Sequence, residues 1–146
     1  MAIDPRVTAL ESLLVRIYAA SAECLSIDMY DRWGAQHDTE EKRAEMYAIG
    51  AKASADHDSS CGELRNAVRS LRAEAPELVR AWAEAHVVLL TEYIASQPEG
   101  STERFVANEE IGGWREVADG TKDFVDENTF YVRVDRARRK ELLGVG

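Results

Sequence analysis

The sequence predicts an α+β fold: a bundle of three or four helices, then a three- or four-stranded antiparallel sheet and a short C-terminal helix. Up to residue 97, apolar residues recur at the three- and four-residue spacing of helices. Beyond residue 103, short aromatic and β-branched runs alternate with turn-forming pairs. We expect one domain over residues 1–146, with a helical part over 1–97 and a β-meander with its terminal helix over 103–146.

The first predicted helix begins at Asp4-Pro5, since Asp is a good N-cap and Pro suits the first helical position. An apolar series then runs along one face and can continue to Trp33, before Gly34. At 1.5 Å per residue this helix would be about 43 Å long, which indicates a bundle or a dimer arm. We therefore expect a homodimer through the N-terminal helix, with three residues in or near the contact: Leu10, Leu14 and Ile17.

Residues 39–73 form either one helix or two. Asp38 and Glu41 have the spacing of a capping box, which predicts a helix start there. The polar run 57–62 can interrupt this helix, so both alternatives stay open. The following stretch, Pro76 to Ser96, has a wide apolar stripe, which predicts a central helix with Trp82 and Leu89 deeply buried.

The predicted meander contains four short strands, 104–107, 114–118, 122–126 and 130–134. Gly112-Gly113, Asp119-Gly120 and Glu127-Asn128 separate these runs and are typical of turns. The segment 97–102 is the expected seam between the helical part and the sheet. A short basic helix from Arg136 to Leu143 is expected to end at Gly144.

Composition limits the possible functions. A formal net charge of −9 makes general binding to phosphate backbones unfavourable, and it favours a basic partner. No uncharged run approaches the ~20 apolar residues that span a bilayer, and the N-terminus has no signal core, so we expect no membrane association. Cys24 and Cys61 are too few for a disulfide scaffold and predict reduced thiols in a cytoplasmic protein. Phosphate-binding glycine motifs are absent, and we expect no cofactor.

His57 and Cys61 are the residues best placed for a metal. They are four residues apart, so on a helix their side chains share a face. A zinc site needs three or four ligands, however, and the sequence places only these two well. The prediction is therefore no metal site.

Two Arg–His pairs have the spacing of a catalytic motif: Arg32 with His37, and Arg80 with His86. This spacing is similar to that in HEPN-type ribonucleases, all-helical proteins in which an Arg and a His cleave RNA. The chemistry is reasonable, because His can move a proton while Arg stabilises a crowded phosphate. His86 also lies on the broad apolar face of its helix, where a hydrogen-bonded core histidine is the simpler interpretation.

A carboxylate-rich surface around an aromatic residue is the candidate partner-binding site. Residues 101–129 hold 8 acidic and 3 basic side chains. Carboxylates can steer a basic partner, and a tryptophan can anchor it. The candidate binding residues are Trp114, Glu116, Asp119, Asp123, Asp126 and Glu127.

These observations together favour a non-enzymatic, acidic binding protein. We expect its partner to be another protein with a basic surface, and not nucleic acid directly. Toxin-immunity proteins and phage-encoded antagonists of host defence are similar in size and charge, so an inhibitor of a nucleic-acid-handling protein is the favoured function. The alternatives are a HEPN-like ribonuclease and a structural subunit of a phage or other assembly.

Overall fold

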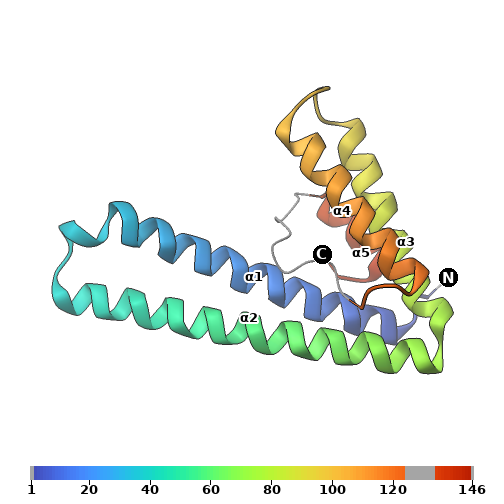
Figure 1. Cartoon of the computed structure of the whole chain (residues 1–146), viewed down its shortest axis with the longest axis horizontal. Coiled ribbons are helices and arrows are strands. Elements are labelled where there is room, and N and C mark those ends of the chain that lie inside the picture. Colours follow the sequence, from blue (N-terminus) through green and yellow to red (C-terminus); the bar gives the residue numbers. More distant parts are fainter. Residues whose placement is uncertain (1, 124–133, 146) are drawn as a thin grey trace. The chain divides into compact units, whose positions relative to one another are not determined.

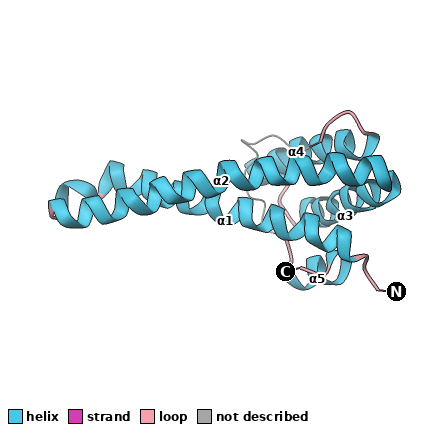
Figure 2. Ribbon diagram, turned by 90° about the horizontal axis from the view of Figure 1, so that it is seen from below, coloured by secondary structure: helices cyan, strands magenta, loops and turns pink. Residues whose placement is uncertain are grey.

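The computed structural model describes residues 2–123 and 134–145, and every regular element within them is helical (Figures 1 and 2). The elements are α1 (Pro5–Trp33), the short 3-10 helix η1 (Ala35–His37), α2 (Glu40–Glu74), α3 (Pro76–Ala95), α4 (Thr102–Asp119) and α5 (Arg136–Leu143). The chain divides into two compact units. The first unit combines Met1–Ser12 with Leu64–Gly146, and the second, which we call the hairpin, is Leu13–Glu63.

The predicted α+β fold is wrong, because no strand occurs in the described residues. Two of the predicted strands, 104–107 and 114–118, lie inside α4, and Gly112-Gly113 is part of the same helix. Ser101 caps this helix, since its side chain accepts a hydrogen bond from the Arg104 amide. Residues 124–126 and 130–133 of the other predicted strands lie outside the described residues.

The buried positions of α4 recur about every 3.6 residues, which is the period of an α-helix. A helix therefore buries all of them on one face. Ala107, Glu110, Ile111, Trp114 and Val117 are the buried residues of α4. Burial of that face outweighs the roughly 1 kcal/mol that each glycine costs in a helix interior. Gly120, at a φ of 84°, ends α4 with the left-handed cap that glycine favours.

Several helical predictions are confirmed. Helix α1 covers the expected range, and α5 ends at Gly144. Residues 40–74 form one continuous helix, which decides between the two alternatives for that region. The expected seam at 97–102 is the loop between α3 and α4, which pack together within the first unit, so no division falls there.

The core of the first unit surrounds α3. Trp82 and Leu89 are buried as predicted, and Trp114 and Val117 of α4 and Leu143 of α5 are buried as well. Within the described residues, no helix is both long and apolar enough to cross a membrane.

The three residues that were expected in or near a dimer contact are Leu10, Leu14 and Ile17. They are buried in the single chain, so these side chains are not open to a second copy.

Candidate functional site: the helical hairpin and its exposed stripe

Polar contacts around η1 hold the turn of the hairpin. The Tyr30 hydroxyl donates to the Asp38 carboxylate at 2.7 Å. The Arg43 guanidinium donates to the backbone carbonyls of Ala35 and Asp38 at 2.9 and 2.6 Å. Burial of the Tyr30 hydroxyl, together with its bond to Asp38, raises the pKa of Tyr30 to about 12. This hydroxyl therefore stays a hydrogen-bond donor across the physiological pH range.

The two helices of the hairpin run antiparallel and approach closely (Figures 1 and 2). A Cβ atom at Gly50 would lie 2.7 Å from Cγ2 of Ile27, so the contact needs glycine. The rings of Tyr30 and Tyr47 meet edge to face with centroids 6.2 Å apart. The Tyr47 hydroxyl also donates to Asp31 at 2.7 Å. These contacts fix which residues of α1 and α2 face one another.

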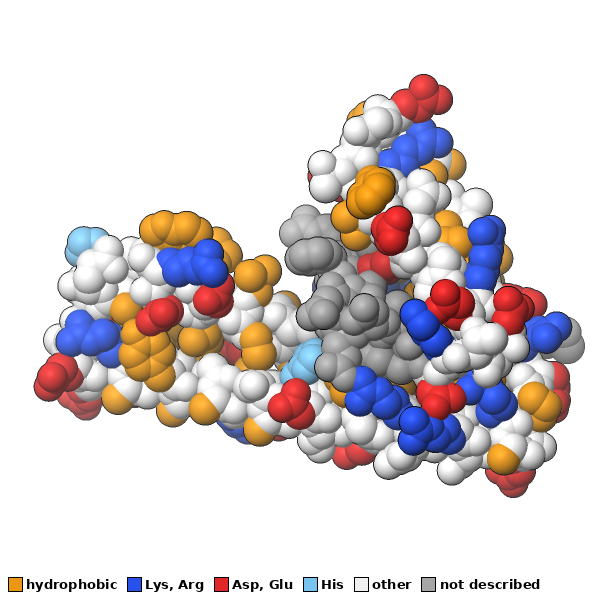
Figure 3. All heavy atoms as spheres, in the orientation of Figure 1, with side chains coloured by type: hydrophobic (Ala, Val, Ile, Leu, Met, Phe, Trp, Pro, Cys, Tyr) orange, Lys and Arg blue, Asp and Glu red, His pale blue; other side chains and the backbone are white. Residues whose placement is uncertain are grey.

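Several large apolar residues of the hairpin are exposed. Across residues 21–52, Ala35 alone is buried. Leu25, Met29 and Trp33 are 59%, 50% and 64% exposed. They follow one another at four-residue steps along α1, and we call them the α1 stripe. Apolar side chains are visible over the hairpin, at the left of Figure 3.

The hairpin is also acidic. It holds 10 acidic and 5 basic side chains, a net charge of −5. All of its acidic residues except Asp38 are exposed. An exposed apolar row within an acidic surface has the composition of an interaction site: an apolar centre with a charged surround.

The first unit holds a second notable group of residues, and this one is buried. Glu11 is fully buried, and its Oε2 accepts hydrogen bonds from Trp82 Nε1 at 3.0 Å and from His86 Nε2 at 2.6 Å. Arg139 Nε lies 3.6 Å from the other carboxylate oxygen. The His86 ring stacks on Trp114, with centroids 4.0 Å apart and planes within 5°. We call these five residues the Glu11 cluster.

The pKa values of two buried carboxyl groups of this unit are shifted in opposite directions. Burial alone would raise the pKa of Glu11, but the charge and hydrogen bond of His86, with Trp82 and Arg139, hold it below its usual value. Glu110, in contrast, has an Oε1 without a hydrogen-bond partner. Burial raises the pKa of Glu110 to about 8. Glu11 is therefore charged at neutral pH, whereas Glu110 is mostly protonated.

The residues of the two Arg–His pairs lie in different surroundings. Arg80 is exposed, whereas His86 is buried against Glu11. Six residues of helix place the two side chains about 120° apart around the helix axis. The Arg80 and His86 side chains therefore do not point to one place. Arg32 and His37 are both exposed, but Arg32 pairs with Asp28 of its own helix at 3.4 Å.

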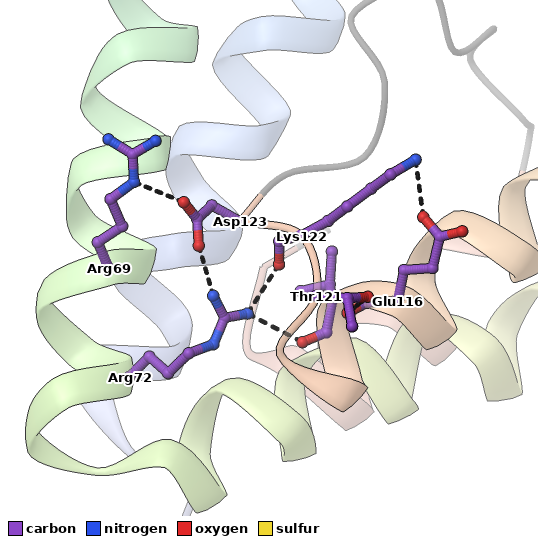
Figure 4. Close-up of polar contacts among 7 residues, drawn as sticks. Arg69, Arg72, Glu116, Thr121, Lys122 and Asp123 are labelled. Atoms are coloured by element: carbon purple, nitrogen blue, oxygen red, sulfur yellow. Dashed lines mark hydrogen bonds and ion pairs between the residues drawn. The ribbon is translucent and has the colours of Figure 1, made fainter.

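The predicted acidic docking face is arranged differently from the expectation. Trp114 is 1% exposed, so it is not available on the surface to anchor a partner. Asp123 is held by both Arg69 and Arg72, and Arg72 also donates to the carbonyls of Val117 and Lys122 (Figure 4).

Two further residues of that face are described. Glu116 pairs with Lys122 at 2.7 Å (Figure 4), and Asp119 is exposed. Asp126 and Glu127 lie outside the described residues. Because Asp123 and Glu116 are engaged by cations of the same chain, they have less charge to offer a partner.

His57 and Cys61 lie on one face of α2, as their spacing predicted. The Cys61 sulfur is 3.9 Å from the His57 ring nitrogens, and His57 Nδ1 lies 3.6 Å from Asp58. In the described part of the chain, no three His, Cys, Asp or Glu side chains come together as metal ligands.

Sequence reasoning missed the α1 stripe and the role of Glu11, although signals for both were present. Leu25, Met29 and Trp33 have the four-residue spacing of a second apolar row on a helix that already had one. Glu11 directly follows Leu10 within the apolar face of α1, where a charged residue implies a buried partner. Its partners come from α3 and α5, so only the folded chain identifies them.

Comparison of the chain with protein-family models, with curated proteins and with solved structures gives no match.

Proposed function

We propose that this chain is a non-enzymatic binding protein that attaches to another protein through the hairpin, and that it inhibits a basic, nucleic-acid-handling partner. The observation that carries the proposal is the α1 stripe, which leaves three large apolar side chains at least half exposed. Isolated exposed apolar residues are ordinary, but a continuous row on one helix face marks an interaction site.

The chemistry of the stripe suits a grooved partner. Side chains at four-residue steps on a helix enter successive pockets of an apolar groove, as in helix-in-groove recognition. Trp33 has the largest side chain of the three, and tryptophan is enriched among residues that dominate binding energy. Burying a large apolar side chain stabilises a complex by about 1.5–3 kcal/mol. Together the three residues can supply the apolar centre of an interface.

The charge of the hairpin indicates the surroundings of that groove. A net charge of −5 repels phosphate backbones and attracts a surface rich in Lys and Arg. Opposite charges around an interface speed the encounter and exclude partners of the wrong sign. The expected partner therefore has an apolar groove with basic residues along its edges. A protein that binds nucleic acid has such basic residues, and an acidic inhibitor can cover them.

Affinity capture with matched variants tests the proposal. Immobilised wild-type protein and a Met29→Ala/Trp33→Ala variant are incubated with the same lysate, and retained proteins are identified by mass spectrometry. Phe105→Ala is the control, because Phe105 is 66% exposed but lies on α4. Circular dichroism checks that each variant remains helical.

The partner is then purified and its affinity is measured. The double variant should bind at least ten-fold more weakly, whereas Phe105→Ala should bind like the wild type. Binding by the wild type should weaken as salt rises, because salt screens attraction between opposite charges. The wild type should also reduce the partner's nucleic-acid binding or cleavage. Equal binding by the double variant and the wild type would show that the α1 stripe is not the contact.

A further inference from the structure

A second surface of the hairpin is a groove between α1 and α2, with a volume of about 580 Å³. Its lining includes three small residues, Ala19 and Ala20 from α1 and Ala53 from α2. Small side chains let another helix approach closely. Leu25 and Met29 of the α1 stripe lie on another face, about 160° and 120° around the helix from Glu23, and the stripe as a whole lies farther along α1 than the groove.

Charged side chains of both signs line the edges of the groove: Arg16 and Glu23 on α1, and Lys52 and Asp56 on α2. Along α1 the positions of the two charges are symmetrical. Arg16 and Glu23 lie equally far, in opposite directions, from the midpoint between Ala19 and Ala20. A two-fold axis at this midpoint, perpendicular to α1, would bring Arg16 opposite Glu23 of a second copy, and Glu23 opposite Arg16 of that copy.

The contacts within the hairpin show where the same axis meets α2. Ile27 faces Gly50, Tyr30 faces Tyr47, and Arg16 pairs with Glu63. In an antiparallel hairpin the numbers of two facing residues have a nearly constant sum, and in these pairs it is 77 to 79. The Ala19–Ala20 midpoint on α1 therefore lies level with about residue 58 of α2.

One pair of opposite charges on α2 lies nearly symmetrically about that level as well. Lys52 lies six residues before residue 58 and Glu63 five residues after it. Eleven residues correspond to about 20° more than three full helical turns, so both side chains point from nearly the same face. The axis that pairs Arg16 with Glu23 of the second copy therefore also brings Lys52 opposite Glu63 of the second copy. One symmetry operation gives four pairs of opposite charges.

We propose that two copies of this chain associate groove to groove, each α1 antiparallel to the other α1 and each α2 antiparallel to the other α2. The product is a four-helix bundle with an isologous interface, the usual form of a two-fold dimer. It would give the hairpin the second layer that helices need in order to bury apolar surface, and it would cover Ile49, which is 43% exposed beside the groove. This dimer does not depend on the proposed partner, since the α1 stripe lies on another face.

Charge exchange tests the pairing directly. Sedimentation equilibrium of the full chain should give a mass approaching twice 16.3 kDa at tens of micromolar protein. Arg16→Glu and Glu23→Arg should each weaken the dimer at least ten-fold, because each variant brings like charges together across the axis. The Arg16→Glu/Glu23→Arg variant should recover most of the affinity, since the exchanged charges again pair with opposite signs. Lys42→Glu, an exposed reversal outside the groove, is the control.

The recovery separates the proposal from simpler explanations. Arg16 also pairs with Glu63 of its own chain, and the double exchange does not restore that contact. A double variant as weak as the weaker single variant would therefore overturn the pairing across the axis. A wild-type chain that stays monomeric at about 100 µM would overturn the dimer itself. Met29→Ala/Trp33→Ala should dimerise like the wild type, and its failure to dimerise would place the contact at the stripe.

Cross-linking tests the position of the axis. A residue at a two-fold axis meets its own copy, so Ala19→Cys should form a disulfide-linked dimer on mild oxidation. The variant is made in a chain whose Cys24 and Cys61 are replaced by alanine. Ala44→Cys is the matched control, since Ala44 is exposed on α2 but does not line the groove. Equal cross-linking of both variants would contradict the proposed axis.

Discussion

Removing the Glu11 carboxylate should strongly destabilise the first unit. Glu11 is fully buried and has three partners: hydrogen bonds from Trp82 and His86, and an ion pair with Arg139. Arg139 and His86 are buried too, so Glu11→Ala would leave them without their carboxylate. Breaking a buried ion pair by removing one partner costs about 3–5 kcal/mol. We expect a loss in that range for the free energy of unfolding.

Urea denaturation at pH 7 measures this loss. Trp82 and Trp114 belong to the Glu11 cluster, so tryptophan fluorescence reports on its opening. Glu84→Ala is the control, because Glu84 is an exposed acid on α3 and surface substitutions usually change stability by less than about 0.5 kcal/mol. The coupling is measured with Arg139→Met alone and in combination with Glu11→Ala. If the pair is real, the double variant loses less than the two single losses together.

The pH dependence gives a second check on Glu11. Its pKa in the folded chain is below its usual value, so its contribution to stability is present above the unfolded pKa near 4.5. That contribution is lost as pH falls through the lower folded value. The free energy of unfolding of Glu11→Ala should therefore fall less steeply than that of the wild type as the pH is lowered. A loss below about 1 kcal/mol with an unchanged acid profile would refute the assigned role of the carboxylate.

Three further substitutions test the first unit. Leu89→Ala should cost about 2–5 kcal/mol in urea melts, because Leu89 is buried in the core. Asp123→Ala should cost about 1–2 kcal/mol, since it removes the partly exposed carboxylate that Arg69 and Arg72 share; an unchanged stability would show that these ion pairs contribute nothing. Burial raises the pKa of Glu110 to about 8, so its neutral form is favoured and stability should fall as pH rises from about 4.5 through about 8. Glu110→Gln should remove this decline and raise the melting temperature at pH 8.

The helices with clear caps and one apolar face were predictable from sequence. Asp4-Pro5 gives the start of α1, and Pro76 gives that of α3. The continuous α2 could not be decided in advance, because the polar run 57–62 weakens a helix locally without ending it. Burial of Ser60 and Cys61 on one side of that run shows that packing prevails there over local propensity.

The region 102–119 was mispredicted because composition was given more weight than period. Gly112-Gly113 and the aromatic and β-branched residues around them are typical of strands and turns. Nothing lies within 4 Å of a Cβ atom placed at Gly112, so no close contact requires glycine there. The helical spacing from Ala107 through Ile111 to Trp114 was the more informative signal, because burial of that face determines the structure.

The candidate site was predicted less well than the helices. Charged and aromatic residues were taken as the surface that meets a partner, yet Trp114 is buried and Asp123 is held by two arginines. Sequence shows the type of a side chain, whereas its availability depends on what other segments bring to it.

The hairpin shows the reverse case. Leu25, Met29 and Trp33 have the composition of a core, but no described segment of the chain covers them. Two helices alone form one layer, and a stable layer needs a second one against its apolar surface. In the described hairpin, the small-residue groove and the α1 stripe lie on different faces, so one further helix cannot cover both. The proposed second copy at the groove and the proposed partner protein at the stripe would together satisfy this requirement, and the charge-exchange and stripe variants test the two contacts separately.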